Sequence, residues 1–304
     1  MDAISLIIAC SRITAAIIAL IGNGIAVFII LKFRTLRCNS SSLLIAQLGF
    51  SDLLLGIGLF IRSVQTFIAL ATNTVLFPKW KCLLYGCIDI LAMHFIQTTT
   101  FFIALDRLTV LVFPLTYRRL NGNRSLSIWR FLICMIYSLC AFAGQFIHFP
   151  PDGTVAVCSS GSIWTDAYRI YFGIFAASIS SLTFGITLLT TIIYWRKASH
   201  SEMRNDSSVM ITMATILLSY TIFWCFPAIL YLSGVIVHTK QAIFGTLTSF
   251  LSFGTGIFAS LNPFLFLWKH QEFRANSFKL FRSQKNYVEN YTTIKVASIT
   301  TSKT

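Results

Sequence analysis

A few charged side chains inside otherwise apolar runs are the residues of this sequence best placed to do chemistry. The run FFIALDRLTVLVFPLTY, residues 101–117, is apolar enough to cross a membrane but carries Asp106 and Arg107 side by side. A charge within hydrocarbon costs roughly 2.5–3.5 kcal/mol per residue on insertion scales. At a helix end such a pair is ordinarily an arginine that reaches toward water with an acid beside it. At the membrane edge it also stands where a partner protein reaches it.

Three further charges lie deeper in apolar runs, at Asp52, Arg62 and Asp89. Asp52 falls near the middle of its run, and ionisable residues at that depth usually mark functional sites. Asp89 shares a helix face with Met93, and Arg62 is expected at a depth similar to that of Asp89. The pattern leaves three alternatives open: an internal Arg62–Asp89 salt bridge, contact of one or both residues with a ligand, or neither.

The composition is that of an integral membrane protein. Of the 304 residues, 56% are hydrophobic and 11% are charged, and the mean hydropathy is +0.74. Soluble domains carry about 25% charged residues, so a soluble fold of this size lacks the polar surface to cover its core. The net charge of +14 does not indicate nucleic-acid binding. Nucleic-acid binders gather basic residues on a soluble face, whereas here Lys and Arg fill short gaps between apolar runs.

Seven apolar runs are long enough to cross about 30 Å of hydrocarbon, which takes roughly 20 helical residues. They cover residues 4–31, 41–69, 82–112, 126–148, 167–195, 207–237 and 241–268. The first run is too long for the apolar part of a signal peptide. We therefore expect an all-α membrane protein, a seven-transmembrane helix bundle over residues 1–268.

Basic residues in the gaps predict the orientation. Eighteen of the 24 Lys and Arg residues lie in one set of gaps and in the C-terminal tail, and five lie in the other set. Cytoplasmic loops carry the excess of Lys and Arg. We expect a multi-pass protein of the plasma membrane with its N-terminus outside and its C-terminus in the cytoplasm.

The chain beyond the last run predicts two further segments. Residues 269–285 place Phe273, Phe278 and Phe281 among Lys and Arg, which indicates a short amphipathic helix on the inner membrane surface with these rings on one face. Residues 286–304 are rich in Ser and Thr, and we expect them to be disordered.

Short motifs recur in a fixed order along the spans. They are Gly22-Asn23, LGFSD at 48–52, Cys82, Asp106-Arg107-Leu108, Pro114-Leu115, Tyr117, Pro227, and Asn262-Pro263 with Phe266. In this order and on these spans the chain resembles the rhodopsin-like G-protein-coupled receptors along its whole length. Within them it is most similar to the nematode serpentine chemoreceptors of class SX.

The resemblance implies an activation switch. In the family the arginine at Arg107 holds the inactive state through Asp106 and swings toward the sixth span and a heterotrimeric G protein. Asp52 pairs with Asn262 around water or sodium. Because Ile96 and Phe258 stand where relatives often have polar ligands, a water-linked or protonated Asp52 is favoured over a sodium site.

Pro227, Pro263 and Phe266 complete the expected switch, with departures from the family pattern. Phe266 and Leu108 replace tyrosines, so two hydroxyls are missing. Trp224 stands one position earlier than the family tryptophan, about 100° around an ideal helix, which leaves its role as the toggle open.

The outer cysteines predict one disulfide. Only cysteines facing the oxidising side should pair, which leaves Cys158 in an outer loop and Cys82 at the outer tip of the third span. Cys87 lies about 7.5 Å deeper and roughly 140° around the helix, so it is the poorer partner. We expect Cys82–Cys158, pinning the loop over a ligand pocket.

The expected pocket contains Asp89, Arg62, Met93, Trp224, Tyr231 and Trp164. In amine-binding relatives an acid at the position of Asp89 holds the ammonium group of the ligand. Aromatic residues such as Trp164 and Tyr231 serve equally well as anchors at the membrane interface.

These features predict a G-protein-coupled receptor for an external small molecule, with a chemosensory role, and with the G protein, the ligand and the lipid bilayer as its partners. An amine or peptide transmitter receptor is the alternative. A transporter or channel is less favoured because no internal repeat is present. The five His residues are scattered and form no H-E-x-x-H motif. We therefore expect no enzyme activity, catalytic residue, metal site or cofactor.

Overall fold

The computed structural model describes residues 3–120, 124–150, 152–156, 158–200, 218–237, 241–269 and 273–278. Seven of the described helices are long and apolar enough to cross a membrane, which confirms the expected seven-helix bundle. They are α1 (Ala3–Lys32), α3 (Ser40–Ala71), α4 (Lys79–Val112), α6 (Arg124–Gly144), α8 (Asp166–His200), α10 (Phe226–Ile236) with the π-helical turn η2 (Thr221–Cys225) before it, and α11 (Gln241–Lys269). The part of the sixth span expected at 207–217 lies outside the described residues.

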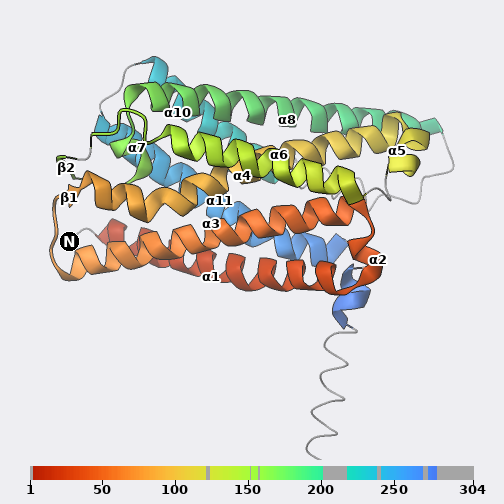
Figure 1. Ribbon diagram of the computed structural model, residues 1–304, viewed down its shortest axis with the longest axis horizontal. Helices are drawn as coiled ribbons and strands as arrows, with labels where there is room; N and C mark the ends of the chain where they lie inside the picture. The colour runs from red at the N-terminus through yellow and green to blue at the C-terminus, as the bar shows by residue number, and fades with distance from the viewer. Residues whose placement is uncertain are drawn as a thin grey trace, which may run out of the picture.

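The long helices run side by side along the long axis of the molecule (Figure 1). α1 packs against α3 and α11, α3 against α4, and α4 against α6 and α8, so α4 has neighbours on several sides. The buried core runs between them and includes Leu55, Ile90, Ile96, Phe172 and Leu251. Residues on α4 are therefore well placed to contact several other helices at once.

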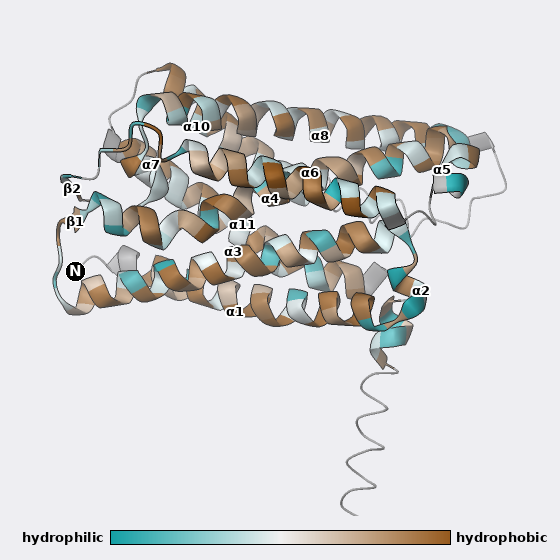
Figure 2. Cartoon of the chain, in the orientation of Figure 1, coloured by the Kyte–Doolittle hydropathy of each residue, from teal (hydrophilic) through white to brown (hydrophobic). Residues whose placement is uncertain are grey.

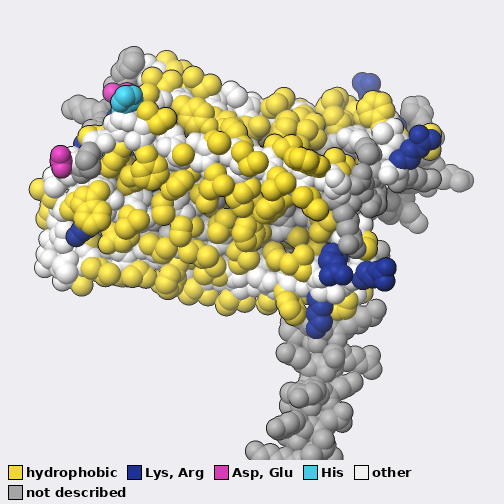
Figure 3. All heavy atoms as spheres, viewed as in Figure 1, with side chains coloured by type: hydrophobic (Ala, Val, Ile, Leu, Met, Phe, Trp, Pro, Cys, Tyr) yellow, Lys and Arg dark blue, Asp and Glu magenta, His cyan; other side chains and the backbone are white. Residues whose placement is uncertain are grey.

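The outside of the bundle is apolar as well. Hydrophobic residues cover the visible sides of the long helices in Figures 2 and 3, and side chains such as Ile21, Phe28 and Ile136 are more than half exposed. A helix that is hydrophobic on all sides suits a membrane span. In Figure 3 most of the visible Lys and Arg side chains gather at the end of the bundle that holds α2 (Arg34–Arg37) and α5 (Pro114–Leu120).

The loop between α6 and α8 closes the opposite end. Strands β1 (Phe77–Pro78) and β2 (Thr154–Val155) pair antiparallel, and the expected disulfide joins Cys82 to Cys158. The short helix α7 (Ser160–Ile163) then packs against α11. Its approach needs a glycine, because a Cβ on Gly161 would lie 2.6 Å from the carbonyl oxygen of Phe244.

The segment after α11 docks on the bundle only in part. Residues 273–278 are helical, and Phe273 is buried in a cluster with Ala26, Ile29 and Leu36. Phe278 is 68% exposed, because five residues turn an α-helix by about 140° from a shared face. The expectation that Phe273 and Phe278 lie on one face is therefore wrong. Phe281 and the tail at 286–304 lie outside the described residues.

Candidate functional site

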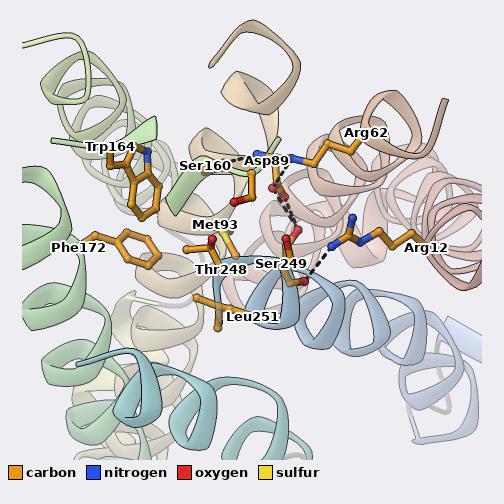
Figure 4. A pocket seen from close by; sticks show the side chains of 12 residues that line it. Arg12, Arg62, Asp89, Met93, Ser160, Trp164, Phe172, Thr248, Ser249 and Leu251 are labelled. Atoms are coloured by element: carbon orange, nitrogen blue, oxygen red, sulfur yellow. Dashed lines mark hydrogen bonds and ion pairs between the residues drawn. The ribbon is translucent and has the colours of Figure 1, made fainter. Parts of the chain in front are cut away.

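A small cavity lies at the end of the bundle that α7 closes (Figure 4). Its lining comes from α1, α3, α4, α7, α8 and α11 together with the residues that flank α7. The lining residues are Arg12, Arg62, Asp89, Met93, Ser159, Ser160, Trp164, Phe172, Thr248, Ser249, Leu251 and Ser252. The volume is ≈ 10 Å³, about the room that one water molecule needs. A larger ligand enters this cavity only when lining side chains move.

Four residues of the expected pocket line this cavity, namely Asp89, Arg62, Met93 and Trp164, and two do not. Tyr231 is fully buried behind the cavity, with its ring 6.4 Å from that of Trp164. Trp224 is also fully buried and stacks on Tyr220 instead. The described structure thus places four of the expected pocket residues in the cavity lining and the other two in the aromatic core.

Arg62 and Asp89, which both line the cavity, form an ion pair with each other. Arg62 Nε lies 3.1 Å from Asp89 Oδ2, and both residues are buried. This contact is an ion pair without a well-aligned hydrogen bond, because Arg62 Nε makes no hydrogen bond within the described residues. Arg62 also donates to the hydroxyl of Ser160, and Ser252 donates to both carboxylate oxygens of Asp89 at 3.1 and 3.2 Å. Of the three alternatives that the sequence left open, the structure contains the internal salt bridge.

Glycines make room for that ion pair. A Cβ on Gly86 would collide with the guanidinium of Arg62, and a Cβ on Gly58 would lie 2.8 Å from the backbone nitrogen of Asp89. α3 and α4 therefore approach closely where the pair forms. The fit explains how a long arginine side chain is accommodated inside the bundle.

Arg12 is the functional candidate that sequence reasoning missed. Its Nη2 donates to the backbone carbonyl of Ser249 at 3.1 Å, while its Nε has no hydrogen-bond partner among the described residues. None of the described carboxylates forms an ion pair with it. The signal was its spacing, since Arg12 precedes Asn23 by 11 residues, about three helical turns, and shares the inward face of that residue.

A second polar centre joins the helices deeper in the bundle. Asn262 on α11 donates to Asp52 Oδ2 at 2.7 Å, and Asp52 is fully buried. Asn23 on α1 donates to the carbonyl of Ala259 at 2.9 Å. Ile96 and Phe258, the apolar residues that weigh against a sodium site at Asp52, are both buried. No cluster of metal-ligating residues occurs in the described part of the chain.

At the opposite end of α4, Asp106 is held by residues of two other helices. Arg130 Nη1 on α6 lies 3.3 Å from Asp106 Oδ1. Ser41 on α3 donates to Asp106 Oδ2 at 2.8 Å and is also hydrogen-bonded to the hydroxyl of Tyr117 at 2.7 Å. Burial raises the pKa of Tyr117.

Arg107 is not paired as expected. Asp106 takes Arg130 and Ser41 as partners, and Arg107 forms no ion pair with any described carboxylate. The expected Asp106–Arg107 lock is therefore absent from this conformation. Arg107 is half-buried.

The sixth span contains a wide turn next to its proline. η2 (Thr221–Cys225) is π-helical and ends just before Pro227. Proline lacks the N–H that an α-helix needs at this point, and a π turn carries one extra residue. Trp224 lies within this π turn and is fully buried, with an exposed fraction of 0%. Phe266 on α11 packs against the same core.

Comparisons with known proteins give one family and two relatives. The family described as the serpentine type 7TM GPCR chemoreceptor Srsx matches residues 16–281. Ceropsin from Bombyx mori is 27% identical over 166 residues, which are 52% of this chain and 42% of that protein. Opsin-1 from Schistocerca gregaria is 28% identical over 184 residues, which are 59% of this chain and 45% of that protein. The chain thus spans less than half the length of the two curated relatives.

Proposed function

Because this chain belongs to the Srsx family of serpentine seven-transmembrane G-protein-coupled chemoreceptors, we propose that it binds an external small molecule between its helices and activates a heterotrimeric G protein. The chain is a multi-pass membrane receptor, and its family is not one of enzymes. The ligand, the coupling and the chemosensory role are the proposed parts.

The arrangement of α4 is the observation that carries this proposal. Asp89 lines the cavity near one end of the helix, and Asp106 and Arg107 lie toward the other end, about 26 Å farther along at 1.5 Å per residue. Each aspartate is paired with an arginine of another helix, Arg62 or Arg130. A displacement of α4 at the cavity therefore changes contacts at both ends.

We further propose that the end holding α2 and α5 faces the cytoplasm and that the receptor lies in the plasma membrane. The excess of Lys and Arg in the loops and tail supports this orientation, as does their gathering at that end in Figure 3. In this orientation the cavity lies near the outer end of the bundle, and Arg107 faces the G protein.

The ligand acts by shifting a population of conformations. A ligand moves this equilibrium only by the difference between its affinities for the two states. In the proposed switch, the bundle opens at the cytoplasmic end and Arg107 contacts the G protein. Asp52 with Asn262, and Pro227 with Pro263 and Phe266, are the proposed hinge and packing residues between the two ends.

Replacing Arg107 by Ala tests this function. We expect nucleotide exchange on the G protein, stimulated or basal, to fall to the background of membranes without receptor, because the partner loses its cationic contact. Cell-surface receptor is measured in parallel. Arg34→Ala is the matched control, since Arg34 is an exposed arginine on α2 at the same end. Retained exchange in Arg107→Ala would refute the assignment of Arg107.

A further inference from the structure

We infer that the ligand of the cavity carries a carboxylate and that Arg12 is its counter-ion. The inference rests on the proposed function and names the chemical class of the ligand. It opposes the expectation that Asp89 holds an amine, and it follows from the charges, the hydrogen-bond donors and the apolar wall of the cavity.

The charges that line the cavity leave an excess of one positive charge. The lining contains the cations Arg12 and Arg62 and the anion Asp89. Arg62 and Asp89 neutralise each other at 3.1 Å, so the guanidinium of Arg12 is the unmatched charge. An ammonium ligand would add a second unmatched cation, whereas a carboxylate would bring the site to neutrality.

Asp89 is also occupied as an acceptor. Its Oδ2 faces Arg62 Nε, and both of its oxygens accept from the hydroxyl of Ser252 at 3.1 and 3.2 Å. An amine that took the place of Arg62 at Asp89 would leave that buried guanidinium without its carboxylate. Removing one partner of a buried ion pair is strongly unfavourable, so the geometry disfavours an amine.

Most of the unpartnered polar atoms around the cavity are donors. They are nitrogens of Arg12, Arg62 and Trp164, together with the Ser159 hydroxyl, which can donate or accept. Arg12 Nε and Trp164 Nε1 are buried and have no hydrogen-bond partner among the described residues. Buried donors without acceptors are costly, and the ligand groups that relieve them are acceptors. Figure 4 shows Arg12 and Trp164 on opposite sides of the cavity, so one compound with an oxygen at each end matches both.

Part of the cavity wall is apolar. Met93, Phe172 and Leu251 line this part of the cavity, and all three are buried. A compound that suits the site therefore has a carboxylate at Arg12 and an apolar body against these side chains. Because the cavity is small in this conformation, binding includes movement of the flexible Arg12 side chain.

Ligand-induced thermal stabilisation of the purified full-length receptor tests the inference. The receptor is held in zwitterionic lipid nanodiscs, so that no anionic headgroup competes. The probes are aliphatic and aryl-substituted carboxylic acids, each run beside its primary amide and the amine with the same carbon skeleton. We expect at least one acid to raise the Tm while its matched amide and amine do not.

Variants of Arg12 assign the counter-ion. We expect Arg12→Gln to raise the Kd of the stabilising acid by about 30-fold or more, the effect of removing one partner of a buried charge pair, and Arg12→Lys to keep more of the affinity. The control Lys81→Gln removes an equal charge from an exposed residue near the same end, and its Kd should match that of the wild type. The Tm of each variant without ligand shows that it is folded.

Three results would overturn the inference. One is a panel in which no acid stabilises the receptor more than its amide. Another is an unchanged Kd in Arg12→Gln, and the third is stabilisation by an amine that is lost in Asp89→Asn. The assay contains no G protein, so acid binding without nucleotide exchange would leave the inference standing and remove the proposed function instead.

Discussion

The two ends of α4 use the same pairing in different surroundings. At the cavity, Asp89 pairs with Arg62 of α3 at 3.1 Å, and at the opposite end Asp106 pairs with Arg130 of α6 at 3.3 Å. The side chain of Arg62 is 6% exposed and that of Arg130 is 17% exposed. The Arg62–Asp89 pair is thus shielded from solvent, whereas the Arg130–Asp106 pair is partly exposed through its arginine.

Each end also holds one arginine that makes no ion pair with a described carboxylate, Arg12 at the cavity and Arg107 at the other end. A guanidinium without a carboxylate is a ready site for an incoming acceptor. Helix pairing and exposure to an incoming partner thus fall to different arginines at each end. The paired arginines hold helices together, and the unpaired ones are those proposed to contact a ligand and a G protein.

The largest loss of stability is expected from Asp89→Asn. The change leaves Arg62 buried without its carboxylate, and breaking a buried ion pair costs about 3–5 kcal/mol. We expect a lower Tm of the purified receptor and less receptor at the cell surface. The double variant Arg62→Gln/Asp89→Asn removes both charges and should regain most of the loss. If Asp89→Asn were as stable as the wild type, the buried Arg62–Asp89 ion pair would not contribute to stability as described.

A smaller loss is expected from Cys158→Ser. The disulfide closes the chain from Cys82 to Cys158, and such cross-links typically contribute about 2–4 kcal/mol. We expect a lower Tm and a weaker response to ligand, because α7 and the loop lose their anchor to α4. Adding Cys82→Ser to Cys158→Ser should change little more. Full stability of the double variant would show that the loop is held by its packing alone.

The smallest loss is expected from Arg130→Gln. Its ion pair with Asp106 is partly exposed, and Ser41 still donates to the carboxylate, so we expect a loss of about 1 kcal/mol. Asp106 becomes less restrained, and basal nucleotide exchange should rise. The measurement pairs a thermal melt with an exchange assay in the absence of ligand. A stability loss equal to that of Asp89→Asn would remove the contrast between the two ends.

The sequence predicts the fold well because length and hydropathy alone decide which segments span a membrane. The Cys82–Cys158 disulfide could also be predicted from the sequence. Few other cysteines are expected on the oxidising side of the membrane at a depth that reaches Cys158. The contact between Asp52 and Asn262, 210 residues apart, came from the family resemblance. The spacing of these residues does not reveal it.

The parts that the sequence did not predict depend on how the helices pack. The partner of Asp106 is Arg130 on a neighbouring helix, and nothing in the local motif favours it over Arg107. In the sequence, Arg12 is one of five basic residues on the expected outer side. Only the packing of α1 against α11 brings its side chain into the cavity lining. The direction of Trp224 depends on the π turn before Pro227, which an ideal helical period does not include.

The most direct test of the account measures whether the two ends of α4 are coupled. Ligand and G protein that favour the same conformation must raise the affinity of each other by the same factor. The measurement is the Kd of the most stabilising compound of the panel, with and without nucleotide-free G protein, for the wild type and Arg107→Ala. We expect the G protein to lower this Kd by about 5- to 150-fold in the wild type and to leave it unchanged in Arg107→Ala. A wild-type Kd that is the same with and without the G protein would contradict this expectation.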